Sequence, residues 1–206
     1  CQYNFLHAVK DITEKNNAIL IFDEIVTGFR HGNTGAQGYF NVMPDLTCIG
    51  KAVANGLPLS VVFGSEEIMR KFPEIFFSLT SAGEALSLAA AKAVLELIKK
   101  IDVSKHLNQV GGIVLDGLKK LIIKYELEDV MIAMGYPCYN RYFFKDNEGM
   151  RLNSLQLMEL WTQEIAKRGI LSCETHIMNY SHTNEMANET LNVYDEVLNL
   201  IKKKRI

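Results

Sequence analysis

The strongest constraint on the fold is an apolar run that ends in two adjacent acids, within the segment AILIFDEIVTGFR at residues 18–30. The stretch from Ala18 to Phe22 is apolar at every position, the pattern of a central strand in a parallel sheet that is covered by helices on both faces. Residues 4–15 before it carry apolar side chains at helical spacing. A helix followed by such a strand predicts an α/β fold, in which sites lie beyond the carboxyl ends of strands. Asp23 stands at that edge.

The rest of the chain predicts two parts. The pattern predicts strands at 45–50, 59–63, twice within 130–145 and at 170–173, and helices at 66–72, 84–101, 107–122, 154–167 and 183–203. The texture changes near residue 125, from strands mixed with long helices to short strands joined by tight turns. We therefore predict a larger domain at 1–124, which includes the connecting helix, and a smaller C-terminal α+β domain at 125–206.

Composition narrows the possible partners. The chain has 206 residues and a formal charge of −2, with scattered basic residues, so nucleic acid is not an expected partner. No apolar stretch is long enough to span a bilayer and no signal peptide opens the sequence, which predicts no membrane partner. The four cysteines are far apart, so we expect neither a metal site nor a disulfide framework, and a reducing cytoplasm fits. We expect His176 and His182 to lie in a loop.

Two kinds of chemistry place a carboxylate after a buried strand. In a P-loop ATPase the carboxylate serves magnesium and water, but the phosphate loop needs Gly-x-x-x-x-Gly-Lys-Ser/Thr. Around Gly50 and Lys51 this chain has Asp45 where the first glycine is required and Ala52 where the hydroxyl is required. The sequence therefore argues against an ATPase.

The second chemistry is that of pyridoxal phosphate (PLP), an organic electron sink that the protein holds and tunes. It uses a lysine amine, which forms a Schiff base with the cofactor aldehyde, and a carboxylate, which keeps the ring nitrogen protonated because a nearby negative charge raises the nitrogen's pKa. Asp23 and Lys51 have the side chains for these roles. Their spacing alone is weak support, since a loop lysine is usually solvated and an Asp after a strand often caps a helix.

A family resemblance strengthens this interpretation. The segments FDEIVTGFR, GAQGYF and PDLTCIGKAVANGLPLSVVFG resemble the cofactor-binding region of class III PLP-dependent aminotransferases, a group that includes glutamate-1-semialdehyde aminomutase. The resemblance is dense over residues 18–64 and continues weakly to the C-terminus. It implies part of a fold-type I PLP-dependent transferase large domain, with a mainly parallel sheet and helices, followed by the small α+β domain.

The resemblance also implies roles for particular residues. By position, Asp23 holds the pyridine nitrogen, Lys51 forms the Schiff base, and Ile25 packs on one face of the ring. Thr80 matches the threonine that reaches the cofactor phosphate of the neighbouring subunit, which implies a homodimer with composite active sites. After Thr80 the chain departs from the family pattern, and we interpret Glu84 there as an acid that suits the positive end of the following helix. We interpret Arg141 as a surface residue.

The resemblance covers only the second half of the family's length. The family's phosphate-binding helix start, a ring-stacking aromatic residue and much of the substrate pocket lie upstream of the strand at 18–22, and the first residue is Cys1. The expected function is therefore amino-group transfer between a small amino donor and a carbonyl acceptor through Lys51, carried by a longer protein. Two alternatives stay open, namely the intramolecular transfer of an aminomutase and a non-catalytic remnant that keeps the fold.

Overall fold

The computed structural model describes residues 4–77 and 80–204. The chain divides into two compact units, and the boundary between them in the sequence lies after Ser104. This division falls earlier in the sequence than the change of texture near residue 125, because most of the helix that follows Ser104 packs into the core of the second unit. The assignment of 1–124 and 125–206 to a large and a small domain stays a prediction.

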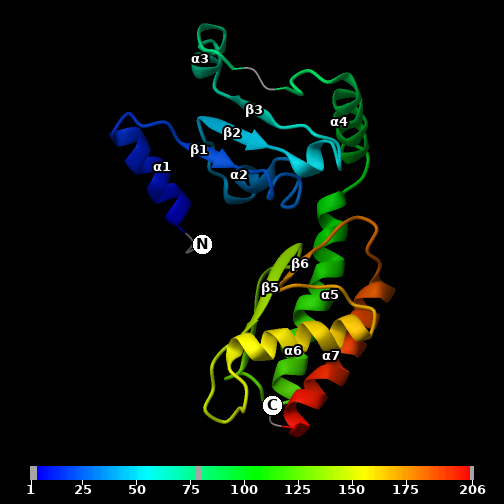
Figure 1. Ribbon diagram of the computed structural model, residues 1–206. Coiled ribbons are helices and arrows are strands. Elements are labelled where there is room, and N and C mark those ends of the chain that lie inside the picture. Colours follow the sequence, from blue (N-terminus) through cyan, green and yellow to red (C-terminus); the bar gives the residue numbers. More distant parts are fainter. Residues whose placement is uncertain (1–3, 78–79, 205–206) are drawn as a thin grey trace. The chain divides into compact units, whose positions relative to one another are not determined.

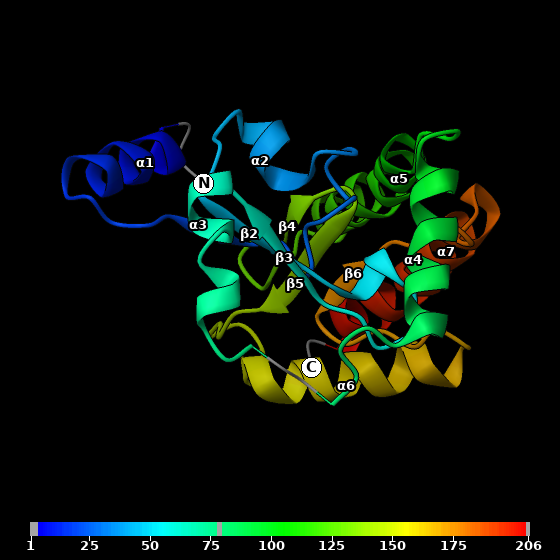
Figure 2. The same ribbon diagram turned by 90° about the horizontal axis from the view of Figure 1, so that it is seen from above.

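The first unit is a small mixed sheet with helices around it (Figure 1). Its elements are α1 Phe5–Lys15, β1 Ile21–Asp23, α2 Gly35–Phe40, β2 Leu46–Ile49, the 3₁₀ helix η1 Lys51–Val53, β3 Val61–Gly64, α3 Glu66–Met69, the 3₁₀ helix η2 Phe72–Glu74 and α4 Ala85–Ile98. The predicted helices at 4–15, 66–72 and 84–101 correspond to α1, α3 and α4. Two views show α2 along one face of the sheet and α1 to one side of it (Figures 1 and 2).

The sheet has the strand order β1-β2-β3. β1 and β2 are parallel, with Ile21 opposite Leu46 and Asp23 opposite Cys48, whereas β3 is antiparallel to β2. The expectation that β1 is a central strand covered on both faces is not met within the described residues, where β1 lies at the edge of the sheet. Ile19 and Ile21 are 55% and 54% exposed. The predicted strand at 18–22 is also shorter and begins later, because only Ile21–Asp23 pairs with a neighbour.

The second unit contains a long helix, an antiparallel sheet and two further helices. Its elements are α5 Val103–Lys124, which begins at the end of the first unit, β4 Met131–Tyr136, β5 Tyr139–Phe144, α6 Ser154–Lys167, β6 Thr175–Ile177 and α7 Asn184–Lys204. The sheet has the order β4-β5-β6. Among the described residues, no helix has the length and apolar character needed to cross a membrane.

The core of the second unit is aromatic. Trp161 of α6, Tyr142 of β5 and Tyr194 of α7 are fully buried and pack edge to face or tilted against one another. The apolar stripe of α5, including Leu118, lies against the same cluster. Gly111 of α5 is required by packing, because a Cβ there would lie 1.9 Å from the carbonyl oxygen of Pro137.

One predicted strand is wrong. The run Ile170–Cys173 is not a strand, and β6 begins at Thr175. The reason is a turn at Glu174, whose φ of 55° lies in the left-handed region and interrupts extended backbone. Ile170 instead packs on the core, and Leu171 is 95% exposed.

Candidate active site

The topology brings the two predicted site residues to the same end of the first sheet, where the parallel strands β1 and β2 have their carboxyl ends. Asp23 is the last residue of β1, and Lys51 follows the end of β2. Cys48 is the partner of Asp23 in the parallel pairing, one strand spacing of about 4.8 Å away. The chain from Cys48 to Lys51 can span at most about 10 Å, so the two backbones are close neighbours in space.

The adjacent acids Asp23 and Glu24 point in different directions. Asp23 is exposed, and its Oδ1 accepts a hydrogen bond from the backbone N–H of Ile25 at 3.0 Å. Glu24 is only 2% exposed, and its carboxylate accepts hydrogen bonds from the amides at the start of α2. One acid of the pair is therefore committed to the fold, and the other is accessible at the sheet edge.

Lys51 has a strained backbone and an accessible side chain. Its φ is 46°, in the left-handed region that residues other than glycine rarely adopt. Such strain tends to gather at functional sites. The side chain is exposed, and in the part of the chain that the structure describes no hydrogen bond or ion pair holds its ammonium group. The 3₁₀ helix that begins at Lys51 contacts α4 and is closed by the N–H of Asn55, which donates to the Lys51 carbonyl at 2.9 Å.

Ile25 lies beside the residue that precedes the lysine. A Cβ placed on Gly50 would lie 3.4 Å from Cγ2 of Ile25 and 3.5 Å from Oγ of Ser60, at ordinary contact distance. Ile25 is half-buried, and the same turn holds Asp23 through the Ile25 amide. Asp23, Ile25 and the start of the Lys51 segment thus converge at one edge.

The other residues singled out in the sequence lie elsewhere. Thr80 is exposed, in the turn before α4 and next to residues outside those described, so its role stays a prediction. Glu84 is the N-cap of α4, and its carboxylate accepts hydrogen bonds from the amides of Leu86 and Ser87, both at 2.7 Å. Arg141 of β5 is exposed and pairs with Glu174 at 3.3 Å.

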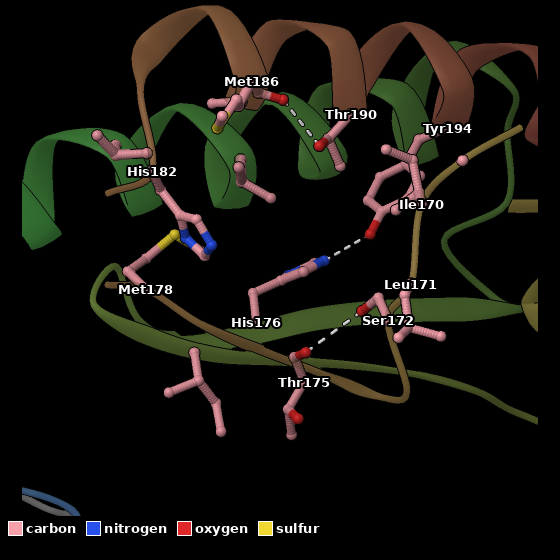
Figure 3. A pocket seen from close by; sticks show the side chains of 15 residues that line it. Ile170, Leu171, Ser172, Thr175, His176, Met178, His182, Met186, Thr190 and Tyr194 are labelled. Carbon is pink, nitrogen blue, oxygen red and sulfur yellow. Dashed lines mark hydrogen bonds between the residues drawn. The ribbon is translucent and has the colours of Figure 1, made fainter. Parts of the chain in front are cut away.

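A separate cavity of about 290 Å³ lies within the second unit (Figure 3). Its walls are mainly apolar, and its polar lining includes His176 and Tyr194. The expectation that His176 decorates a loop is wrong. It belongs to β6 and is 7% exposed.

His176 joins two strands and a helix. Its Nδ1 lies 2.7 Å from Oδ1 of Asn140 and its Nε2 lies 2.7 Å from Oη of Tyr194. The amide of Asn140 also donates to the Pro137 carbonyl, so the Asn140 oxygen faces the ring and must accept from Nδ1–H. Tyr194 then donates to Nε2. Burial lowers the pKa of His176 to about 4, which keeps this neutral arrangement at pH 7. Every polar group of the network is satisfied, which is how a buried structural network behaves.

Sequence comparison decides the family. A profile described as "Aminotransferase class-III" matches residues 1–139, which is more than half of the chain. The chain belongs to the class-III aminotransferase family. Similar relatives include a protein named glutamate-1-semialdehyde 2,1-aminomutase 1 from Staphylococcus carnosus, 32% identical over 212 residues. A protein of the same name from Staphylococcus aureus is 32% identical over 211 residues. Each match covers 97% of this chain and 49% of the relative, so this class-III chain spans about half the length of the curated relatives it matches.

Solved structures support the class-III fold. A structure of the FumI protein from Sphingopyxis sp. MTA144, in its PLP internal aldimine form, matches with a TM-score of 0.87 and 23% identity, covering 98% of this chain and 48% of that one. The ornithine δ-aminotransferase of Plasmodium falciparum matches with a TM-score of 0.81 and 18% identity, covering 98% and 53%. The fold is therefore that of about half of a PLP-dependent transaminase chain, as the sequence predicted.

Proposed function

We propose that this chain carries the cofactor-holding half of a PLP-dependent class III aminotransferase, with Lys51 and Asp23 as its catalytic residues. The observation that supports the proposal is the parallel pairing of β1 with β2, by which the backbone at Asp23 and the backbone just before Lys51 lie at the same end of the sheet. The chain's membership of the class-III aminotransferase family is the reason for assigning PLP chemistry to these two residues.

The described residues fit the ring and the aldehyde of PLP. One oxygen of Asp23 holds the Ile25 amide, which leaves the other available to a ring N–H. Ile25 offers a branched apolar side chain at the same edge, and the Lys51 amine is accessible. For the phosphate, Thr80 is the candidate in this chain, and it would act on the partner subunit's cofactor in a homodimer.

Each residue has a separate task in amino transfer. When bound, PLP supplies the electron sink for the reaction. The Asp23 carboxylate holds a proton on the ring nitrogen, because an adjacent negative charge favours the protonated form. Lys51 would hold the cofactor aldehyde through its Nζ and, in its neutral form, would accept and donate protons at that atom as a general base. Ile25 would cover one face of the ring and keep water from it.

The substrates we propose are a small amino donor and a carbonyl acceptor. The relatives named as aminomutases favour a second form of the activity, in which the amino group moves within one molecule. An aminomutase converts glutamate-1-semialdehyde with no added acceptor, whereas an aminotransferase needs a separate amine and 2-oxo acid. We place the enzyme in the cytoplasm, where Cys48, Cys138 and Cys173 would remain the free thiols that they are here.

Covalent trapping tests the proposal. The chain is incubated with PLP, reduced with borohydride and mapped by mass spectrometry, first alone and then with the upstream half of the Staphylococcus carnosus relative supplied in trans. We expect label on Lys51, stronger in the second mixture, and lost in Lys51→Ala. Lys92→Ala is the matched control, because Lys92 is an exposed lysine of α4. Absence of label on Lys51 in both mixtures, with the chain folded by circular dichroism, would instead support the non-catalytic remnant.

A further inference from the structure

We propose that Glu24 is a positioning residue, whose buried carboxylate fixes the turn after β1 and thereby sets where Asp23 and Ile25 point. The proposal rests on the proposed function, because it concerns the same site. In the proposed chemistry Asp23 acts on the cofactor, whereas the Glu24 carboxylate is buried and hydrogen-bonded within the fold.

The Glu24 carboxylate is surrounded by donors. Its Oε2 accepts from the backbone N–H of Ala36 at 2.6 Å and from the hydroxyl of Thr27 at 3.0 Å, and its Oε1 accepts from the N–H of Gln37 at 2.9 Å. Both oxygens are therefore used, and the two amides belong to the first turn of α2. Hydrogen bonds to an ionised acceptor are stronger than those between neutral groups, so this one side chain ties the turn after β1 to α2.

The Glu24 carboxylate packs closely against Gly35. A Cβ on Gly35 would lie 2.3 Å from Oε2 of Glu24, so this position, which has a φ of 67°, needs glycine. The charge also acts on a neighbour. Burial lowers the pKa of His31, and the negative charge of Glu24 partly opposes that effect. Because a buried carboxylate is costly without partners, its three hydrogen bonds are the condition under which Glu24 can occupy this place.

Backbone hydrogen bonds of Glu24 connect this anchored residue to the candidate site. Its N–H donates to the Cys48 carbonyl at 2.8 Å, and its carbonyl accepts from the Gly28 N–H at 2.8 Å. Successive side chains of extended backbone point to opposite sides. With Glu24 held toward α2, Asp23 must face away from it, and Ile25 follows in the turn that reaches Gly50.

Glu24→Gln tests the inference with a minimal change of shape. A glutamine has one oxygen in place of two, so its NH₂ group would meet either the Gln37 N–H or the pair formed by Ala36 N–H and the Thr27 hydroxyl. We expect faster amide exchange in the full 206-residue chain at Ala36 and Gln37, and also at Ile25, whose N–H is bonded to Asp23. Exchange in the β2-β3 pairs should stay as in the wild type.

Two other variants serve as a control and as a milder test. Glu67→Gln is the matched control, because Glu67 is an exposed glutamate of α3 and should leave all these amides unchanged. Thr27→Val removes one donor and keeps the side-chain shape. If Glu24→Gln does not fold, Thr27→Val should still raise exchange at Ile25, to a smaller extent. Faster exchange at Ala36 and Gln37 with no change at Ile25, in whichever of the two variants folds, would reduce Glu24 to a purely structural cap and overturn the proposal.

A cofactor readout separates positioning from stability. In the enzyme reconstituted with the upstream half, below the melting temperature of every variant, we expect Glu24→Gln to lower the turnover about tenfold while PLP and borohydride still label Lys51, since small misplacements of reacting groups have large kinetic effects. A turnover equal to that of the wild type would also overturn the inference. If the wild type itself gives no label, the proposed function fails, and the exchange at Ile25 still decides whether Glu24 fixes the position of Asp23.

Discussion

Oδ1 of Asp23 accepts a hydrogen bond from the N–H of Ile25, two residues further along the chain, at 3.0 Å. An asparagine at position 23 keeps an oxygen that can accept this bond, but it loses the negative charge. We therefore expect Asp23→Asn to change the free energy of unfolding by less than about 0.5 kcal/mol, as is usual for exposed positions.

The same substitution should remove most of the turnover in the enzyme reconstituted with the upstream half, because a neutral amide does not hold the ring nitrogen protonated. Urea unfolding of the chain and steady-state rates of the reconstituted enzyme measure the two effects. Label on Lys51 should persist in this variant. Full turnover in Asp23→Asn would refute the role given to Asp23.

The two adjacent glycines of α5 should respond in opposite directions to alanine. A Cβ on Gly111 would meet the Pro137 carbonyl oxygen, whereas one on Gly112 has no neighbour within 4 Å. We expect Gly111→Ala to destabilise the second unit by about 1–3 kcal/mol, the usual range for overpacking. Gly112→Ala should stabilise it by about 1 kcal/mol through helix propensity. Urea denaturation of both variants measures this contrast, and equal effects would contradict the packing described at Pro137.

Acid should destabilise the second unit through His176. Its pKa is lowered from 6.5 to about 4 by burial, so the unfolded chain binds a proton more readily than the folded chain between these values. Stability is therefore highest above pH 6.5, falls as the pH drops toward 4 and levels off below it. The two pKa values correspond to a loss of about 3 kcal/mol.

Unfolding curves measured from pH 7 to pH 4 test this dependence. His176→Gln should flatten the slope, because an amide can bond both Asn140 and Tyr194 without titrating. His7→Gln, at an exposed position of α1, should keep the wild-type slope. A slope that survives in His176→Gln would assign the acid sensitivity to another group.

The N-cap of α4 gives a second acid dependence, of the carboxylate kind. The pKa of Glu84 is lowered, first by the hydrogen bond from the Ser87 hydroxyl and then by the amides of Leu86 and Ser87. A lowered pKa means that the cap stabilises the helix above the ordinary glutamate pKa and is lost as the pH falls through the lower, folded value. At neutral pH, Glu84→Ala should speed amide exchange at Leu86 and Ser87. Glu96→Ala, further along α4 and exposed, should not. Unchanged exchange in Glu84→Ala would contradict the cap.

Local signals allowed much of the fold to be predicted. The bounds of α6 agree with the prediction because Asn153 and Gln156 form a reciprocal capping box at its start and Gly169 follows its end. The strand predicted at Ile170–Cys173 failed because apolar character alone does not reveal the left-handed turn at Glu174. The ends of a helix can thus be predicted from nearby capping residues, whereas a short strand forms only if a neighbouring strand pairs with it.

The candidate site was predictable in part. The family pattern named Asp23 and Lys51, and the topology places the backbone of both at one sheet edge. The role of Glu24 was missed, since its donors Ala36 and Gln37 lie 12 and 13 residues away and only the folded chain brings them together. The alternation of extended backbone was the available signal, because it requires two adjacent acids to face opposite ways. No comparable signal in the sequence linked His176 to Tyr194.

The position of β1 at the rim of its sheet has a consequence for handling this polypeptide. On the side away from β2, its backbone amides and carbonyls have no strand partner among the described residues, and Ile19 and Ile21 stand in water beside them. An uncovered, apolar strand of this kind is a template onto which another chain can add. At high concentration, purified molecules should accordingly associate along this strand, and Ile21→Lys should reduce that association.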